Sequence, residues 1–382
     1  MWKRMAVCLT AVWTVWISAV SVPVSAAAAP ENSAAAAVVM ELSTERVLYG
    51  KNEDASMTMA STTKIMTALL TLEAGNLDQE FTVDPNAIMV EGTSMGLQKG
   101  DKVTLRALAC GMLLSSGNDA ANAAAVRIAG SISEFAKLMN ERAAQLEMTG
   151  SSFVTPSGLD AEGHYSTALD MAKLACAALK NEDFRAICSQ SSVKVTFGNP
   201  PVDRWLSNHN KLLETYEGCI GLKTGFTKLS GRCLVSAAER DGVTLVCVTL
   251  KDPNDWDDHA ALLDWGFTQV ERVELIADLS GRTVPVTGGV LSETTVLQGE
   301  EASLVLPVGE RANLRQEISL PIFLYAPVQA GNLIGEVCWY LDDETEPCKT
   351  VPLLAGSISE IDTTLETPFW KRIKGWFYRL FH

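Results

Sequence analysis

The 382-residue sequence has only four histidines, and no pair of its nine cysteines has the spacing of a zinc site. We therefore expect no protein-bound metal, and no motif indicates a cofactor. Positive charge is also scarce, because 31 Lys and Arg residues face 46 Asp and Glu residues, a net charge of −15. This balance argues against nucleic acid as a partner of the globular part of the chain.

Hydrophobic residues make up 47% of the chain and charged residues 20%, so a large packed core is expected and disorder is not. The length allows two to three domains.

The N-terminus has the features of a secretory signal peptide. Lys3 and Arg4 precede an apolar run over 5–20, and Val24-Ser25-Ala26 offers small residues at a cleavage site. The alternative is a membrane-spanning anchor, for which the run is short. We predict a signal peptide over 1–26 and a flexible lead-in over 27–34. Export permits disulfides, so a Cys338–Cys348 bridge across a hairpin remains open.

Residues 35–270 alternate between strand and helix patterns. Apolar spacing predicts a helix from about Ser61 and helices over 104–114, from 118, and over 133–147, 167–180 and 257–265. Strands are predicted as a pair within 34–50 and over 193–197, 219–223, 233–239 and 243–251. Strands at both ends with helices between them indicate an α+β fold, an antiparallel sheet with helices, rather than a doubly wound sheet.

The remainder of the chain has a different pattern. Residues 271–355 contain strand-length apolar runs and turns, so we predict a small β-sandwich domain, followed by a linker over 356–367. Over 368–382, a helical wheel places seven apolar residues on one arc: Phe369, Trp370, Ile373, Trp376, Phe377, Leu380 and Phe381. Four basic residues fall outside that arc: Lys371, Arg372, Lys374 and Arg379. This predicts an amphipathic helix in the membrane interface; the alternative is a terminal helix packed on its own β domain.

Three short motifs follow one another in the first domain: Ser61-Thr62-Thr63-Lys64, Ser116-Gly117-Asn118 and Lys223-Thr224-Gly225. A single Ser-x-x-Lys is expected about once by chance, and Ser191 to Lys194 is a second instance. A serine at a helix start is also a common N-cap, and Ser, Gly and Asn are common turn residues. The order of the three motifs is therefore what indicates function.

Each motif suits one part of an acyl transfer. A serine hydroxyl needs a neighbouring base, and Lys64 lies on the same helical face as Ser61. A lysine acts as a base only when burial or nearby positive charge lowers its pKa, and Lys223 is a candidate for that charge. Ser116 and Asn118 would relay a proton and hold a substrate amide. We expect residues 223–225 to form an edge strand, where the glycine would let a substrate peptide lie close alongside the strand.

These motifs resemble those of the low-molecular-mass D-alanyl-D-alanine carboxypeptidases, penicillin-binding enzymes of serine peptidase family S11. The match includes the neighbours of each motif and the stretches Ser157 to Asp160 and His164 to Ala168. The resemblance implies that an acyl-enzyme forms and removes the terminal D-alanine of peptidoglycan stem pentapeptides, and that β-lactams acylate the same serine. It assigns catalysis to Ser61, Lys64 and Ser116, and substrate binding to Asn118, Lys223, Thr224, Gly225 and Phe226. The N–H groups of Ser61 and Phe226 would form the oxyanion hole. The family also implies an exported enzyme at the outer face of the cytoplasmic membrane.

The sequence departs from the family pattern at two places. Some members carry an arginine on the strand after the third motif, but residues 251–256 contain none, and only Arg232 is near. Thr155 stands where an asparagine is usual. Three other functions remain open. A serine β-lactamase would carry an additional glutamate spaced before an asparagine, and no asparagine follows Glu162 at that spacing. An endopeptidase or transpeptidase would contain the same three motifs. A catalytically idle wall-binding protein would contain them too.

Overall fold

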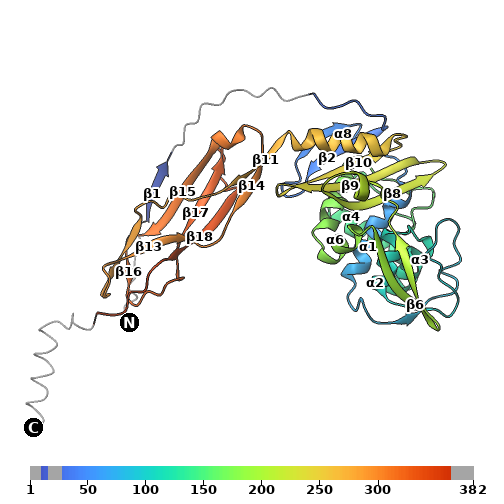
Figure 1. Cartoon of the computed structure of the whole chain (residues 1–382), viewed down its shortest axis with the longest axis horizontal. Coiled ribbons are helices and arrows are strands. Elements are labelled where there is room, and N and C mark those ends of the chain that lie inside the picture. Colours follow the sequence, from blue (N-terminus) through green and yellow to red (C-terminus); the bar gives the residue numbers. More distant parts are fainter. Residues whose placement is uncertain (1–9, 16–27, 363–382) are drawn as a thin grey trace, which may run out of the picture. The chain divides into compact units, whose positions relative to one another are not determined.

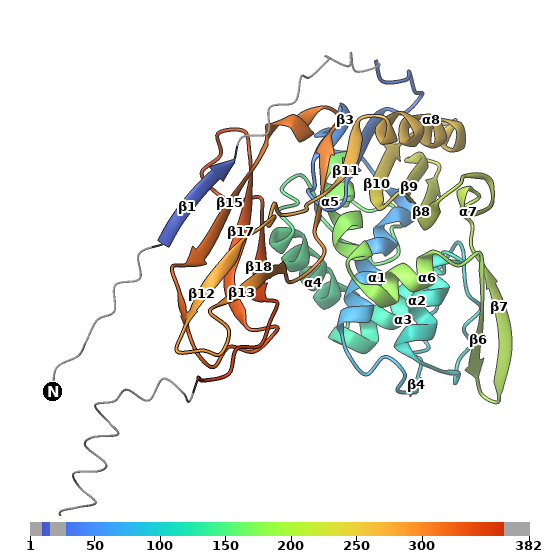
Figure 2. The same ribbon diagram turned by 60° about the vertical axis from the view of Figure 1, so that its left-hand side comes forward.

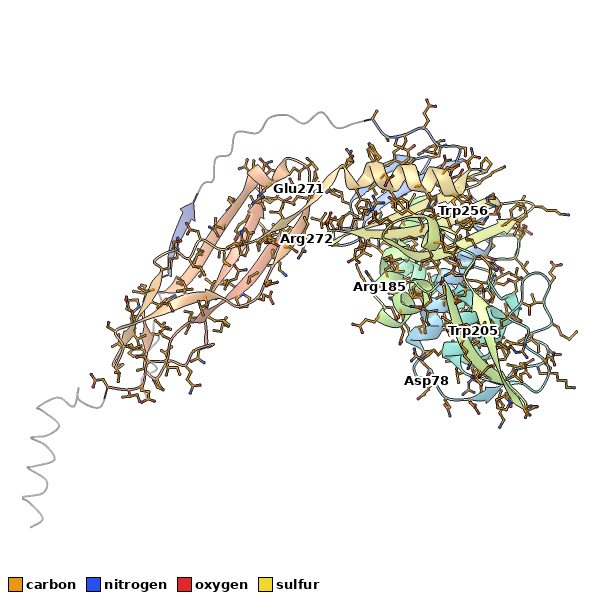
Figure 3. All side chains as sticks on the ribbon, in the orientation of Figure 1. Asp78, Arg185, Trp205, Trp256, Glu271 and Arg272 are labelled. Atoms are coloured by element: carbon orange, nitrogen blue, oxygen red, sulfur yellow. The ribbon has the colours of Figure 1, made fainter. Side chains whose placement is uncertain are left out.

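The computed structural model describes residues 10–15 and 28–362. They fall into two compact units whose boundary lies between Glu271 and Arg272, both labelled in Figure 3. The first is built of helices and strands and the second of strands with one short 3-10 helix, so the predicted fold class is confirmed. One strand, β1 (Thr10–Val15), falls within the predicted signal peptide and pairs antiparallel with β15 (Leu314–Pro321) of the second unit. The signal peptide itself stays a prediction.

A five-stranded sheet forms the frame of the first unit, in the order β3-β2-β10-β9-β8 with every neighbouring pair antiparallel. Its strands are β2 (Ala36–Glu41), β3 (Val47–Lys51), β8 (Cys219–Thr227), β9 (Gly231–Arg240) and β10 (Val243–Leu250). Every residue of β10 is buried, because this central strand is covered on both faces. β8, which carries the third motif, is an edge strand, as the sequence predicts.

Helices cover both faces of this sheet. α8 (Asp255–Phe267) packs on one face against β9 and β10 (Figure 1), and α5 (Ala168–Leu179) packs against β10 on the other. The other helices on the α5 side are η1 (Ala60–Thr63), α1 (Lys64–Glu73), α2 (Leu105–Leu113), α3 (Asn118–Ala129), α4 (Ile132–Gln145) and α6 (Glu182–Cys188). The short helix α7 (Leu212–Thr215) follows β7 and contacts the edge strand β8. The apolar face predicted after Ser61 is confirmed, because Ile65, Met66 and Leu69 are fully buried.

Several short elements escaped the sequence analysis. They are α6, α7, the strand pair β4 (Phe81–Thr82) and β5 (Lys102–Val103), and the strand β7 (Pro201–Ser207). β7 forms a hairpin with the predicted strand β6 (Ser192–Gly198), and this hairpin is drawn at the right of Figure 2. β7 begins with a proline and has mostly exposed side chains, so it lacks the alternation of a half-buried strand. The second Ser-x-x-Lys pattern lies on β6, where Lys194 forms an ion pair with Asp203.

The second unit contains a seven-stranded sheet, β1-β15-β17-β18-β13-β12-β16, and a two-stranded sheet, β11-β14. Its other strands are β11 (Val270–Glu274), β12 (Thr283–Thr287), β13 (Glu293–Gln298), β14 (Ser303–Pro307), β16 (Leu324–Tyr325), β17 (Leu333–Leu341) and β18 (Lys349–Ala355), with the 3-10 helix η2 (Glu310–Asn313). Alternating buried residues from these strands form a separate core around Val337, Trp339 and Val351. We call this unit the β domain.

Two predicted boundaries are wrong. Residues 356–361 still belong to the β domain, because Ser359 bridges to Val328 and Ile361 to Gly289, so the linker does not begin at residue 356. The lead-in over 27–34 is fixed at its end, where the Ser33 hydroxyl oxygen lies 2.6 Å from an Asp252 carboxylate oxygen and 2.7 Å from an Asp258 carboxylate oxygen.

All eight described cysteines are free thiols, including Cys338 and Cys348. In the β17–β18 register Cys338 faces Thr350, whereas the Cys348 N–H donates to the Trp339 carbonyl. The two thiols are therefore offset along the hairpin instead of facing each other.

No helix within residues 10–15 and 28–362 is long and apolar enough to span a membrane. The predicted amphipathic helix over 368–382 lies outside the described residues.

One close approach in the first unit depends on a glycine. A Cβ added at Gly225 on β8 would lie 3.0 Å from the Met59 carbonyl oxygen and 3.1 Å from the Ser61 nitrogen of η1. These neighbours are backbone atoms, which cannot rotate away, so only glycine lets β8 pack this closely on η1.

We therefore expect Gly225→Ala to lower the free energy of unfolding in urea by about 1–3 kcal/mol, the usual cost of overpacking. Gly50→Ala, on the opposite edge strand β3, is the matched control, because a Cβ there meets only the movable end of the Glu53 side chain. Equal effects of the two substitutions would show that the close packing of β8 on η1 is unimportant for stability.

Candidate active site

Ser61 and Lys64 lie at the junction of η1 and α1. The Ala60 residue before the serine has φ of +48°, a left-handed conformation uncommon for a non-glycine residue. The 3-10 turn then brings the Lys64 amine to 2.9 Å from the Ser61 hydroxyl oxygen. Lys64 is completely buried, whereas Ser61 lines a cleft.

The Lys64 amine has three contacts, and their chemistry differs. It lies 2.7 Å from the Asn118 amide oxygen and 2.6 Å from the Ser157 carbonyl oxygen, and both of these atoms only accept hydrogen bonds. A neutral amine has two hydrogens and one lone pair. With both hydrogens donated to these oxygens, the lone pair is left for the Ser61 hydroxyl, which is how a base that removes its proton is oriented.

The surroundings of Lys64 favour this neutral form. Burial lowers the pKa of Lys64 well below its ordinary value of 10.5, and the positive charge of Lys223 lowers it further. The carboxylate of Asp119 opposes these two effects but is the smallest of the three. Both effects favour the neutral amine, which is the form that can accept the Ser61 proton.

The second motif occupies the turn between α2 and α3. Ser116 has φ of +57°, which points its side chain into the cleft, while Thr93 donates a hydrogen bond to its carbonyl. The Asn118 amide nitrogen donates to the Glu91 carbonyl at 2.7 Å, so both ends of the amide are engaged. Asn118 therefore positions Lys64. Its amide nitrogen keeps a second hydrogen and it lines the cleft, so the expected contact with a substrate amide stays a prediction.

Asp119, the next residue, fixes the loop that borders the cleft. Its carboxylate accepts hydrogen bonds from the N–H groups of Met95, Gly96 and Leu97 and from the Ser94 hydroxyl. The loop residues Gly92 and Thr93 then line the cleft.

The third motif follows a bulge in β8. The register shifts between Cys219 and Gly221, and Leu222 has φ of +108°. Bulges commonly redirect a side chain. Lys223 is buried, and burial lowers its pKa to about 7. Its amine donates to the Thr224 carbonyl at 2.7 Å.

The three motifs meet at one cleft of about 470 Å³. Six of the predicted site residues line it: Ser61, Ser116, Asn118, Thr224, Gly225 and Phe226. The other two, Lys64 and Lys223, are buried behind it. The structure therefore brings together residues separated by more than 160 positions in the chain.

A second cavity, of about 510 Å³, lies elsewhere on the first unit. It is lined by charged residues that include the ion pairs Arg142–Glu73 and Lys180–Glu45. It contains no hydroxyl group beside a base, so its larger volume does not make it the candidate active site. Within residues 10–15 and 28–362, no three histidine, cysteine or carboxylate side chains gather as a metal-binding group.

The sequence analysis missed the structural role of the segment 157–164. A Cβ on Gly158 would lie 2.0 Å from the Ala60 carbonyl oxygen, so this segment packs directly behind the nucleophile. The His164 Nδ1 accepts from the Val154 N–H at 3.0 Å, which leaves Nε2–H to donate to the Thr63 hydroxyl, also at 3.0 Å. Burial lowers the pKa of His164 to about 4, so the imidazole that contacts Thr63 stays uncharged.

The residues that line the cleft also include Arg232, Asp255 and Trp256. Arg232 is the second residue of β9 and lies opposite Phe226, and its guanidinium donates to one Asp255 carboxylate oxygen at 2.6 and 3.0 Å. It also lies over the ring of Trp256, which Figure 3 labels on the first turn of α8. Glu162, by contrast, is exposed and is not among the residues that line the cleft.

Comparison with known proteins agrees with this geometry. Residues 23–254 match the family model of the D-alanyl-D-alanine carboxypeptidases, and residues 277–358 match that of the C-terminal domain of penicillin-binding protein 5. D-alanyl-D-alanine carboxypeptidase DacF of Bacillus subtilis is 32% identical over 82% of this chain and 83% of its own length. DacC of Escherichia coli is also 32% identical, over 83% of this chain and 82% of its own length.

Among solved structures, the carboxypeptidase DacD of Francisella tularensis superposes with a TM-score of 0.63 at 27% identity, covering 90% of this chain and 98% of that one. The family model alone spans more than half of the sequence, and the motifs that it shares meet in one cleft. The chain belongs to the D-alanyl-D-alanine carboxypeptidase family of serine peptidases.

Proposed function

We propose that this protein removes the terminal D-alanine from peptidoglycan stem pentapeptides through an acyl-enzyme on Ser61. The observation that carries the proposal is the Lys64 amine, held by two carbonyl oxygens so that its lone pair faces the Ser61 hydroxyl. An edge strand beside this pair suits a substrate that lies alongside as an extended peptide.

In the acylation step, the Ser61 oxygen attacks the carbonyl carbon of the penultimate D-alanine while Lys64 takes its proton. The negative oxygen that develops lies between the N–H groups of Ser61 and Phe226, each worth about 3 kcal/mol in comparable sites. Their separation depends on the close packing at Gly225. The C–N bond then breaks, and the Ser116 hydroxyl passes a proton to the leaving D-alanine nitrogen while it regains one from Lys64. Hydrolysis by water releases the shortened peptide and restores the Ser61 hydroxyl.

Thr224 and Lys223 hold the terminal carboxylate of the substrate in this account. Arg232 adds a further cation that lines the cleft, in a chain whose residues 251–256 lack the family's usual arginine. Because one Asp255 oxygen already holds two of its donors, the remaining guanidinium N–H groups are available to the carboxylate.

The other functions fit the cleft less well. A β-lactamase needs a base for the water that releases its acyl group, and Glu162 is not placed to supply one, so a penicillin should stay attached to Ser61 for long periods. An endopeptidase that cuts crosslinks would use the same acyl-enzyme. An idle wall-binding protein would have no use for a base oriented toward Ser61.

The decisive experiment is release of free D-alanine from a stem pentapeptide by the chain from residue 27. We expect release by the wild type and at least a thousandfold loss in Ser61→Ala, the scale seen when a serine nucleophile is removed. Labelling of Ser61 by a fluorescent penicillin without D-alanine release would favour the endopeptidase. Neither release nor labelling would favour the wall-binding protein.

Arg232→Gln tests the proposed carboxylate contact. Loss of one charge-assisted hydrogen bond, roughly 1.5–3 kcal/mol, should raise KM about tenfold or more and leave kcat within a few-fold. Arg240→Gln is the matched control, because Arg240 ends the same strand and pairs with Asp264 away from the cleft. An unchanged KM in Arg232→Gln would remove this residue from the account.

The pKa of Lys223 predicts a decrease of kcat/KM on the alkaline side of the pH profile. Its amine carries a charge below about pH 7 and loses it above, so kcat/KM of the free enzyme should fall as the pH rises through that value. Lys223→Arg keeps its charge and should remove the fall, although its absolute rate is lower. A fall at the same pH in the variant would mean that another group titrates.

We further propose that the protein is exported to the outer face of the cytoplasmic membrane and held there by residues 368–382. The support is the arc of aromatic residues with basic residues outside it. Ending the chain at Thr367 should abolish binding to vesicles of anionic lipid and leave D-alanine release unchanged. Equal vesicle binding of the two chains would contradict the anchor.

A further inference from the structure

One end of the β domain carries an exposed apolar surface, which we call the apolar cap: Val290, Leu291, Phe323, Tyr325, Ile358 and Ile361. Their side chains are 44 to 72% exposed. Six of the eleven exposed large apolar side chains among residues 272–362 gather here. Apolar side chains concentrated in this way mark an interaction surface more often than isolated ones do.

Backbone contacts show that the three segments carrying the cap are neighbours. β12 pairs in parallel with β16 through Val286 and Leu324. The turn after β12 meets the end of the described chain, because Gly289 bridges to Ile361 and the Val290 N–H donates to the Glu360 carbonyl at 2.9 Å. The rings of Phe323 and Tyr325 contact each other edge to face, with centroids 5.1 Å apart.

The charged residues in the three segments that carry the cap are all acidic. The segments 286–293, 322–328 and 356–362 contain no lysine or arginine but include Glu293, Glu360 and Asp362. An anionic bilayer would repel such a surface, whereas a basic and apolar peptide would complement it.

The chain itself continues into such a peptide. Described structure ends at Asp362, within the cap and at the end of the β domain that carries β16 (Figure 1). Residues 369–382 contain four Lys and Arg residues and no acidic one, together with the aromatic arc predicted from the sequence. Only six residues separate Phe369 from Asp362, so their Cα atoms lie at most about 25 Å apart. So short a connection gives the segment a local concentration on the order of millimolar at the cap.

We propose that the apolar cap binds the chain's own C-terminal segment, residues 369–381, and shelters its apolar arc in water. The same arc cannot contact the cap and a membrane at once, so the cap and the bilayer compete for it. This inference rests on the proposed membrane anchor and adds a second, intramolecular site for the same segment. The cap thereby sets how strongly the enzyme partitions onto membranes.

The proposal is tested by whether substitutions in the cap strengthen or weaken binding to vesicles. The cap variant combines Tyr325→Ser with Ile361→Ser and so removes two apolar side chains of the cap. The matched control combines Ile276→Ser with Val308→Ser, because both residues are exposed in the β domain outside the cap. With the competing site weakened, the cap variant of the chain from residue 27 should bind anionic vesicles more tightly, by up to about tenfold, and the control should not change. Weaker binding of the cap variant would overturn the proposal and show that lipid itself contacts the cap.

Hydrogen exchange without vesicles separates this inference from the anchor. A helix of this length is marginal in water on its own, so protection of the 369–381 amides in the wild type, lost in the cap variant, would support docking. Absence of protection in both proteins would overturn it. Failure of the wild type to bind vesicles would contradict the anchor, while the exchange result would still decide whether the segment docks. Thermal unfolding of both double variants checks that the β domain remains folded.

Discussion

The buried Lys64 amine is the point on which the active site depends. A lysine taken completely out of water is costly to fold unless it is neutral or well paired, and here two carbonyl oxygens receive its hydrogens. Those carbonyls come from Asn118 and Ser157, on two separate segments that both pack against α1. The same contacts that make Lys64 tolerable in the core also orient its lone pair toward Ser61. Stability and chemistry are therefore satisfied by one geometry.

The backbone around this amine holds unusual conformations at each motif. Ala60, Ser116 and Leu222 all have positive φ, and each lies within or directly before one of the three motifs. Such residues cost on the order of 1–3 kcal/mol each and persist only where the surrounding structure fixes them. Here these conformations are held by the tight contacts at Gly158 and Gly225, by the hydrogen bonds of His164, and by the Asp119 carboxylate that binds the neighbouring loop. The cleft is a rigid, preorganised site built on sheet and helix ends.

Much of this could be predicted from the sequence, because apolar periodicity and motif order are local signals. The helix after Ser61, the edge position of Lys223 and the all-β character of the second domain are of this kind. The remainder depends on contacts between distant segments. The carbonyl of Ser157 leaves no side-chain signature in the sequence. The contacts of the Asn118 amide with Lys64 and Glu91 add a positioning role that the motif does not reveal, and the position of Arg232 is defined only by its contacts with Asp255 and Trp256. The ends of the linker and lead-in were misjudged for the same reason, since Ser359 and Ser33 are fixed by residues far away in the chain.

The most direct test of the account is the protonation state of Lys64, observed by nitrogen NMR of the lysine side chains in the chain from residue 27. The Lys64 signal, identified by its loss in Lys64→Met, should change from the shift of an ammonium to that of a neutral amine at a pH well below 10.5. A signal that stays that of a charged ammonium up to about pH 9 would contradict the central claim. Lys64 would then need another group to receive the Ser61 proton.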